Sequence, residues 1–307
     1  MENINTLIFG HKNPDTDSIC SSIVHSILDK KNGLETKPVR LGKINKETQF
    51  VLNYLNLEAP ELIEKVEEGQ NVLLVDHNEF NQSVDGIEKA NILGVTDHHK
   101  IANFQTSTPL YFTSKPYGCT ATILFEEFKR LGHEIGRTEA ILMLSAIISD
   151  TLLLKSATTT KHDEIALEEL ASLANINAQE YGLEMLKAGT SLDDLPVEEL
   201  ILDAKSFSKN GINFVIAQVN TVSYDDVLKR KVEIENAINK IIERDNLNIF
   251  VFAITDILNC NSKIIALGKD VNIVEKAFNV KLENNVAFLE GVTSRKKQLI
   301  PPIDACV

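Results

Sequence analysis

Three short apolar segments early in the chain each lead into aspartate or histidine. They are Thr6–Phe9, which leads to His11; Val72–Val75, which leads to Asp76; and Ile92–Val95, which leads through Thr96 to Asp97, His98 and His99. Such runs, separated by helical patterns, are typical of buried strands in a parallel sheet. The carboxyl ends of parallel strands meet at one edge of the sheet, so we expect these polar side chains to converge there.

The first segment carries three ligand-type side chains within seven positions. His11, Asp15 and Asp17 have the spacing His-x3-Asp-x-Asp, and a helical pattern follows over Ser18–Lys31. We expect both aspartates in the loop between the strand and the helix. A single aspartate there is commonly just the helix N-cap. Carboxylates and imidazoles at the ends of three strands instead favour a functional site that holds a cation.

The first half of the chain alternates between strand and helix patterns, which predicts an α/β fold with a doubly wound, mainly parallel sheet. The expected strands are Thr6–Phe9, Val39–Leu41, Val72–Val75 and Ile92–Val95, and the expected helices are Ser18–Lys31, Glu47–Leu55, Thr120–Leu131, Thr138–Ile148, Lys161–Ala174 and Ala178–Ala188. Asp150 follows the fourth of these helices and locally resembles only a helix end.

A break in the pattern at Gly189–Pro196 predicts two domains in the 307 residues. We expect a metal-binding domain over 1–189, a hinge over 190–196 and a smaller α/β domain with a mixed sheet over 197–307. The expected elements of the second domain are strands Ile212–Val219, Ile249–Ile254, Lys263–Leu267 and Val286–Leu289, and helices Tyr224–Arg244 and Val271–Phe278.

The net charge of −13 limits the partners of the protein. Such an acidic surface repels polyanions at long range, so we expect no nucleic-acid partner, although a small anion held by cations and local basic groups is compatible. No apolar run approaches the ~20 residues that cross a bilayer, and no signal peptide is evident. We therefore expect a cytoplasmic protein with no membrane partner. The four cysteines lack zinc spacing.

The residue types at the predicted sheet edge suit particular metals. A site rich in carboxylates, with one imidazole per ion and no thiolate, favours Mn²⁺, Co²⁺ or Fe²⁺ over zinc. Several carboxylates this close would repel one another, and two cations bridged by shared aspartates would remove that repulsion. A water between two such ions loses a proton near neutral pH and becomes a nucleophile.

The motifs together resemble those of family II inorganic pyrophosphatases, the manganese-dependent branch of the DHH phosphoesterase superfamily. The resemblance spans nearly the whole chain, in the short form without a CBS insertion. It rests on His11-x3-Asp15-x-Asp17, Asp97-His98-His99, Gly118-Cys119-Thr120-Ala121-Thr122, Ser149-Asp150-Thr151, Lys155-Ser156-Ala157-Thr158 and Ser294-Arg295-Lys296-Lys297-Gln298.

The resemblance implies a role for each matching residue at a site with two manganese ions. One ion would be held by His11, Asp15, Asp76 and Asp150, and the other by Asp17, Asp76, His98 and Asp150, with Asp76 and Asp150 bridging. Asp97 would orient a ligating imidazole. His99 would face the substrate phosphate, as an acid or as a hydrogen-bond donor.

The resemblance also implies a substrate and a way of binding it. Lys205, Arg295 and Lys296 would clamp pyrophosphate, which enters with Mg²⁺, in a cleft between the domains that closes at the hinge, and the enzyme would be a homodimer. An exopolyphosphatase is one alternative. Another is a DHH-type phosphodiesterase or oligonucleotide exonuclease, but these carry a glycine-rich motif in the second domain, and this sequence has no Gly-Gly pair.

Overall fold

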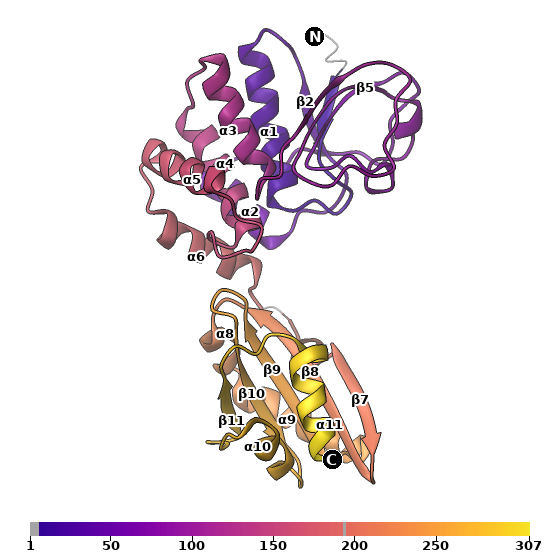
Figure 1. Cartoon of the computed structure of the whole chain (residues 1–307), viewed down its shortest axis with the longest axis vertical. Coiled ribbons are helices and arrows are strands. Elements are labelled where there is room, and N and C mark those ends of the chain that lie inside the picture. Colours follow the sequence, from indigo (N-terminus) through magenta and orange to yellow (C-terminus); the bar gives the residue numbers. More distant parts are fainter. Residues whose placement is uncertain (1–5, 193–194) are drawn as a thin grey trace. The chain divides into compact units, whose positions relative to one another are not determined.

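In the computed structural model, residues 6–192 and 195–307 are described, and the chain divides into two compact units, 1–189 and 190–307 (Figure 1). Residues 193 and 194, within the expected hinge, lie outside the described residues.

Unit 1 contains a six-stranded sheet in the order β3-β2-β1-β4-β5-β6, in which every described pairing is parallel. The strands are β1 Thr6–Phe9, β2 Lys37–Arg40, β3 Glu61–Leu62, β4 Asn71–Val75, β5 Asn91–Asp97 and β6 Tyr111–Ser114. This order reverses direction between β1 and β4, as in a doubly wound sheet. The predicted parallel sheet is confirmed, and the reversal lies between two of the three strands that lead into Asp or His.

The described residues of unit 1 also form the α-helices α1 Thr16–Lys31, α2 Lys46–Leu55, α3 Thr120–Leu131, α4 Arg137–Thr151, α5 Lys161–Ala174 and α6 Ala178–Gly189. Helix α4 lies among α1, α3 and α5, and residues 140–148 are all buried. This surrounding explains why α4 is apolar on all sides rather than along one stripe. The opposite face of the sheet packs against side chains between β3 and β5, among them Val66, Val84 and Ile87.

Unit 2 contains a five-stranded sheet in the order β11-β10-β9-β8-β7. The strands are β7 Ala204–Lys209, β8 Ile212–Thr221, β9 Ile249–Asp256, β10 Asn261–Leu267 and β11 Val286–Leu289. Strands β8 and β9 pair in parallel, whereas the other three pairs are antiparallel. The predicted mixed sheet is therefore confirmed.

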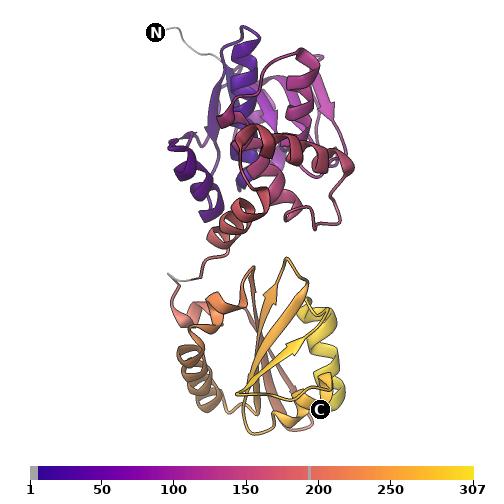
Figure 2. The same ribbon diagram turned by 90° about the vertical axis from the view of Figure 1, so that its left-hand side faces the viewer.

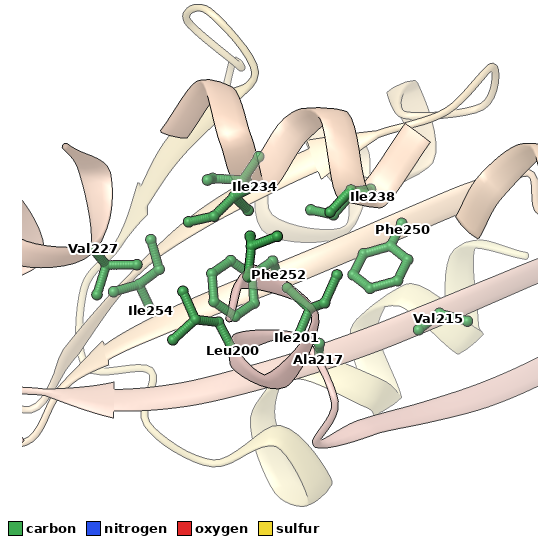
Figure 3. Packing of buried hydrophobic residues seen from close by; sticks show 13 residues of the cluster. Leu200, Ile201, Val215, Ala217, Val227, Ile234, Ile238, Phe250, Phe252 and Ile254 are labelled. Carbon is green, nitrogen blue, oxygen red and sulfur yellow. The ribbon is translucent and has the colours of Figure 1, made fainter. Parts of the chain in front are cut away.

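Helices cover both faces of this sheet, and every residue of the central strand β9 is buried. One face packs against α7 Val197–Leu200, α8 Tyr224–Leu228 and α9 Lys231–Asp245, and the other against α10 Asn272–Phe278, the π-helical turn η3 Arg295–Leu299 and α11 Ile300–Cys306. In Figure 2 the sheet of unit 2 is seen between α9 and α11. Figure 3 shows Phe250 and Phe252 of β9 facing Ile234 and Ile238 of α9.

The expected single helix Tyr224–Arg244 is wrong, because the structure has two helices there, α8 and α9. Arg230 lies at the break as the N-cap residue of α9. Its guanidinium donates hydrogen bonds to the carbonyl oxygens of Leu192 and Leu195 and to Glu233. In the described chain, no helix is long and apolar enough to cross a bilayer.

The packing of β9 predicts a large loss of stability for Phe252→Ala. Phe252 is 0% exposed in the sheet core, so its truncation should lower the free energy of unfolding of unit 2 by about 3–5 kcal/mol. Phe288→Ala is the matched control, since Phe288 lies in β11 of the same sheet but is 49% exposed. Urea titration should show a loss below about 1 kcal/mol for the control. Equal losses for the two variants would contradict the packing described here.

Candidate metal centre

The carboxyl ends of β1, β4 and β5 bring together the imidazoles and carboxylates that follow them. His11 Nε2 lies 3.4 Å from Asp15 Oδ2 and 3.4 Å from Asp76 Oδ2. His98 Nε2 lies 3.3 Å from Asp76 Oδ1 and 3.7 Å from Asp150 Oδ2. These groups therefore gather at the reversal point of the sheet, where doubly wound folds bind their ligands.

The side chains form three overlapping groups in which the potential ligand atoms all lie within 4.8 Å of one another. The groups are His11, Asp15 and Asp76; Asp17, Asp76, His98 and Asp150; and Asp76, His98 and His99. Asp76 belongs to all three, as expected of a bridging ligand. Among the described residues Asp150 joins only the second group, which differs from the expectation that it contacts both ions.

Asp76 is held so that its two oxygens face different groups. It is buried and follows β4 with a positive φ of 59°, a conformation that is unusual for a residue with a side chain and that is often found at functional sites. Oδ2 accepts a hydrogen bond from Ser18 Oγ at 2.6 Å and faces His11, whereas Oδ1 faces His98. The backbone thus presents one carboxylate to both sides of the centre.

Asp15 is both a helix cap and a member of the centre. Its Oδ1 accepts the backbone N–H of Ser18 at 3.0 Å as the N-cap of α1, and its Oδ2 faces His11. Helix α1 begins at Thr16, so the expectation that Asp17 lies in the preceding loop is wrong. Gly10 allows this tight turn, because a Cβ at that position would lie 2.5 Å from Ser18 Oγ.

Asp17 is oriented by a helix more than a hundred residues away in the sequence. It is fully buried, and its oxygens accept the backbone N–H of Thr120 at 2.7 Å, the N–H of Ala121 at 3.3 Å and the hydroxyl of Ser21 at 2.5 Å. The two N–H groups belong to the first turn of α3, where the helix dipole favours negative charge. This contact gives the Gly118–Thr122 motif a role that the sequence pattern did not reveal.

His98 and His99 are held by different partners. His98 Nδ1 lies 3.1 Å from the carbonyl oxygen of Tyr117, so that Nδ1 carries the proton and Nε2 faces the carboxylates. Asp97 accepts hydrogen bonds from the backbone N–H of His99 at 2.9 Å and from His99 Nδ1 at 3.0 Å. The imidazole that Asp97 contacts is therefore that of His99, not that of His98.

Negative charge is crowded in this small buried volume. Burial raises the pKa of Asp76 well above its usual value, and the charges of Asp17 and Asp15 raise it further. Burial likewise raises the pKa of Asp150, helped by the same two neighbours. Burial also acts to raise the pKa of Asp15, but the hydrogen bond and charge of His11, the backbone N–H of Ser18 and the charge of His98 together outweigh it, and the pKa is lowered.

This chemistry fits divalent cations. A cation between the groups would compensate the charge that burial and repulsion otherwise disfavour. The donors are carboxylate oxygens and imidazole nitrogens, and no cysteine belongs to any of the groups formed by the described residues. Such a donor set suits Mn²⁺.

Asp150 is the one residue of these groups that could not be found from its local sequence. It lies in the last turn of α4, which then ends in three successive left-handed residues, Leu152, Leu153 and Leu154. The only local signal is an acidic residue at the end of an otherwise apolar, buried helix.

Apart from His99 of unit 1, the expected substrate residues lie in unit 2. Lys205 is exposed on β7, and Arg295 and Lys296 lie in η3. The guanidinium of Arg295 donates to the carbonyl oxygen of Asp203 and, at 2.8 Å, to its carboxylate. Arg295 is thereby held beside the start of the strand that carries Lys205.

Comparisons with known proteins agree across the whole chain. Residues 5–147 match the DHH family, N-terminal domain, and residues 183–306 match the DHHA2 domain. The chain is 54% identical over 297 residues to a "Probable manganese-dependent inorganic pyrophosphatase" of an Exiguobacterium species, covering 96% of each chain. It is 53% identical over 304 residues to a protein of the same name from Staphylococcus carnosus, covering 98% of this chain and 99% of the relative.

A solved structure supports the same relationship. The crystal structure of a Methanococcus jannaschii "putative family II inorganic pyrophosphatase" is 40% identical in sequence and has a TM-score of 0.61, and the match covers 98% of this chain and 99% of that one. An exopolyphosphatase-related protein from Bacteroides fragilis shares the fold at 14% identity, with a TM-score of 0.52. The identity to the pyrophosphatases over nearly the full length shows that this chain belongs to the family II, manganese-dependent inorganic pyrophosphatases.

Proposed function

We propose that this protein hydrolyses inorganic pyrophosphate to two phosphates at a site that holds two Mn²⁺ ions. The observation that carries the proposal is the position of Asp76. Its carboxylate belongs both to the group with His11 and Asp15 and to the group with Asp17, His98 and Asp150, which are called the two main groups below. The names of the relatives that are 53–54% identical support the substrate and the metal.

The two ions would have different sets of ligands. His11, Asp15 and Asp76 would hold one ion, and Asp17, Asp76, His98 and Asp150 would hold the other. Co²⁺ would be able to replace Mn²⁺ in such a set, and Mg²⁺ would enter with pyrophosphate. When bound, the ions would neutralise phosphate charge and make a water reactive as a nucleophile near neutral pH.

His99 is suited to contact a substrate phosphate. Its Nδ1 is engaged by Asp97, and its side chain is 51% exposed. The hydrogen bond with Asp97 raises the pKa of His99, which favours the protonated ring. A protonated His99 would donate a hydrogen bond from Nε2 to a phosphate oxygen or give up that proton as an acid.

The basic residues of unit 2 would bind the other end of the substrate. We propose that movement at 190–196 lets Lys205, Arg295 and Lys296 close on a pyrophosphate held at the metal centre. Arg295 would exchange its bonds with Asp203 for two phosphate oxygens, which its planar guanidinium suits, whereas the lysines would act as point charges. Closure would exclude water and strengthen each of these contacts.

We also propose a cytoplasmic homodimer, as the family resemblance implies. Strand β6 pairs with β5 at the end of the sheet, and its Tyr111 is 88% exposed, so the edge of unit 1 offers a surface for a second copy. Light scattering coupled to size exclusion should give twice the mass of the chain, and the mass of a single chain would contradict the dimer.

A substrate panel tests the proposed activity. Protein loaded with Mn²⁺ should release phosphate from pyrophosphate much faster than from tripolyphosphate or from a dinucleotide. The panel should be run once with Mn²⁺ and once with Mg²⁺ alone. Preference for tripolyphosphate would identify an exopolyphosphatase, and preference for the dinucleotide would identify a phosphodiesterase or exonuclease.

Metal content distinguishes the roles of Asp76 and Asp150. Asp76→Asn should reduce the binding of both ions, because each main group loses a carboxylate, whereas Asp150→Asn should mainly reduce one. Elemental analysis and Mn²⁺ titration would measure this difference. Asp85→Asn is the control, since Asp85 is 79% exposed and pairs with Lys12. Full occupancy in Asp76→Asn would remove the basis for a bridging role.

Arg295→Ala should weaken substrate binding while leaving the metal centre intact. Loss of a charge-assisted phosphate contact of about 1.5–3 kcal/mol corresponds to a rise in KM of roughly 10- to 100-fold. Lys297→Ala is the matched control, because Lys297 is exposed in the same turn and is not among the expected substrate residues. Steady-state kinetics with parallel metal analysis would measure both effects. An unchanged KM for Arg295→Ala would leave this arginine as an ordinary surface residue.

A further inference from the structure

Glu47 bonds to two segments of the metal centre without belonging to it. It lies in the first turn of α2, outside every motif of the sequence analysis. Its Oε1 accepts a hydrogen bond from Thr16 Oγ1 at 2.7 Å and another from Ser149 Oγ. Thr16 also lies 3.2 Å from the hydroxyl of Thr48, the next residue of α2.

Both partners of Glu47 are direct neighbours of expected ligands. Thr16 stands between Asp15 and Asp17, and Ser149 immediately precedes Asp150 in α4. One carboxylate oxygen therefore links the start of α1 to the end of α4, two segments that are far apart in the sequence. These segments carry Asp17 and Asp150, which belong to the same group of potential ligands. The link through Glu47 therefore constrains the distance between their two carboxylates.

Gly189 lies close against the side chain of Glu47. A Cβ at Gly189, the last residue of α6, would lie 2.9 Å from Glu47 Cβ and 3.0 Å from Oε2, so only a glycine leaves the carboxylate its present place. Burial raises the pKa of Glu47, and the hydrogen bonds from Ser149 and Thr16 act in the opposite direction. Glutamine has the same shape and keeps an acceptor oxygen where Oε1 meets Thr16 and Ser149.

We propose that Glu47 is a positioning residue of the metal centre. It holds the Asp15–Asp17 and Ser149–Asp150 segments at the separation required by the ion that Asp17, Asp76, His98 and Asp150 would bind. The inference rests on the proposed binding of Mn²⁺. It concerns metal affinity and does not depend on which phosphate compound is the substrate.

Titration of the metal-free protein with Mn²⁺, followed by calorimetry and by the electron paramagnetic resonance of the ion, tests this role. Glu47→Ala removes both hydrogen bonds and should weaken Mn²⁺ binding by roughly 10-fold or more, the usual effect of losing a group that orients metal ligands. Glu47→Gln keeps an oxygen acceptor at the same place and should stay close to the wild-type affinity. A purely structural role would not predict rescue by glutamine together with a changed Mn²⁺ spectrum in the alanine variant.

Two serines of α4 provide a second, independent pair. Ser149→Ala removes the bond to Glu47, whereas Ser145→Ala, one turn earlier, removes bonds to the Ile141 carbonyl oxygen and to the Tyr181 hydroxyl. Only Ser149→Ala should weaken Mn²⁺ binding. This pair decides the question if circular dichroism shows that Glu47→Ala does not fold.

Wild-type Mn²⁺ affinity in Glu47→Ala and Ser149→Ala would overturn the inference, as would equal losses in Ser149→Ala and Ser145→Ala. If the wild type bound Mn²⁺ but did not hydrolyse pyrophosphate, the proposed substrate would fail while the Glu47 result stood. If the wild type bound no Mn²⁺, both proposals would fail together.

Discussion

Repulsion among closely spaced carboxylates is the constraint on which unit 1 depends. Asp15, Asp17, Asp76 and Asp150 lie within a few ångströms of one another or of shared imidazoles, and burial raises the pKa of Asp76 and Asp150. The fold supplies partial compensation through hydroxyl groups and through the first turn of α3. The remaining negative charge would be compensated by cations, so the crowding that disfavours the metal-free centre would favour metal binding there.

The sheet places these groups and the helices orient them. Parallel strands deliver His11, Asp76 and His98 to one edge at the reversal point between β1 and β4. Helix α3 then points its first N–H groups at Asp17, and α4 brings in Asp150 from the other side. The partners of Asp17, Asp76 and His98 described above are backbone groups and short hydroxyls, whereas His99 is held by the carboxylate of Asp97.

Much of the fold and of the candidate site could be predicted from residue patterns. Short apolar runs mark buried parallel strands, and the Asp and His residues that follow them must then meet at one edge of the sheet. The failures have local causes. The sequence pattern of Asp15 fits either a helix cap or a metal ligand. In the structure Oδ1 caps α1, and Oδ2 faces His11 in the group of potential metal ligands. Asp97 is expected to orient a ligating imidazole, and the imidazole that it contacts is that of His99, a member of the group with Asp76 and His98. Strand β7 was not foreseen, because its alternation places exposed lysines and serines on a sheet edge with little apolar signal.

The sequence by itself determined the class of fold, the chemistry of the centre and the family, because these follow from residue types and spacings along a few short segments. Only the three-dimensional arrangement shows how the candidate ligands group, which imidazole each acceptor contacts, and that Glu47 joins the start of α1 to the end of α4. The reason is physical: a hydrogen bond or a shared carboxylate depends on distance and direction in space. Residues such as Asp17 and Thr120, or Glu47 and Ser149, are about a hundred positions apart, and no periodicity of the chain records their contact.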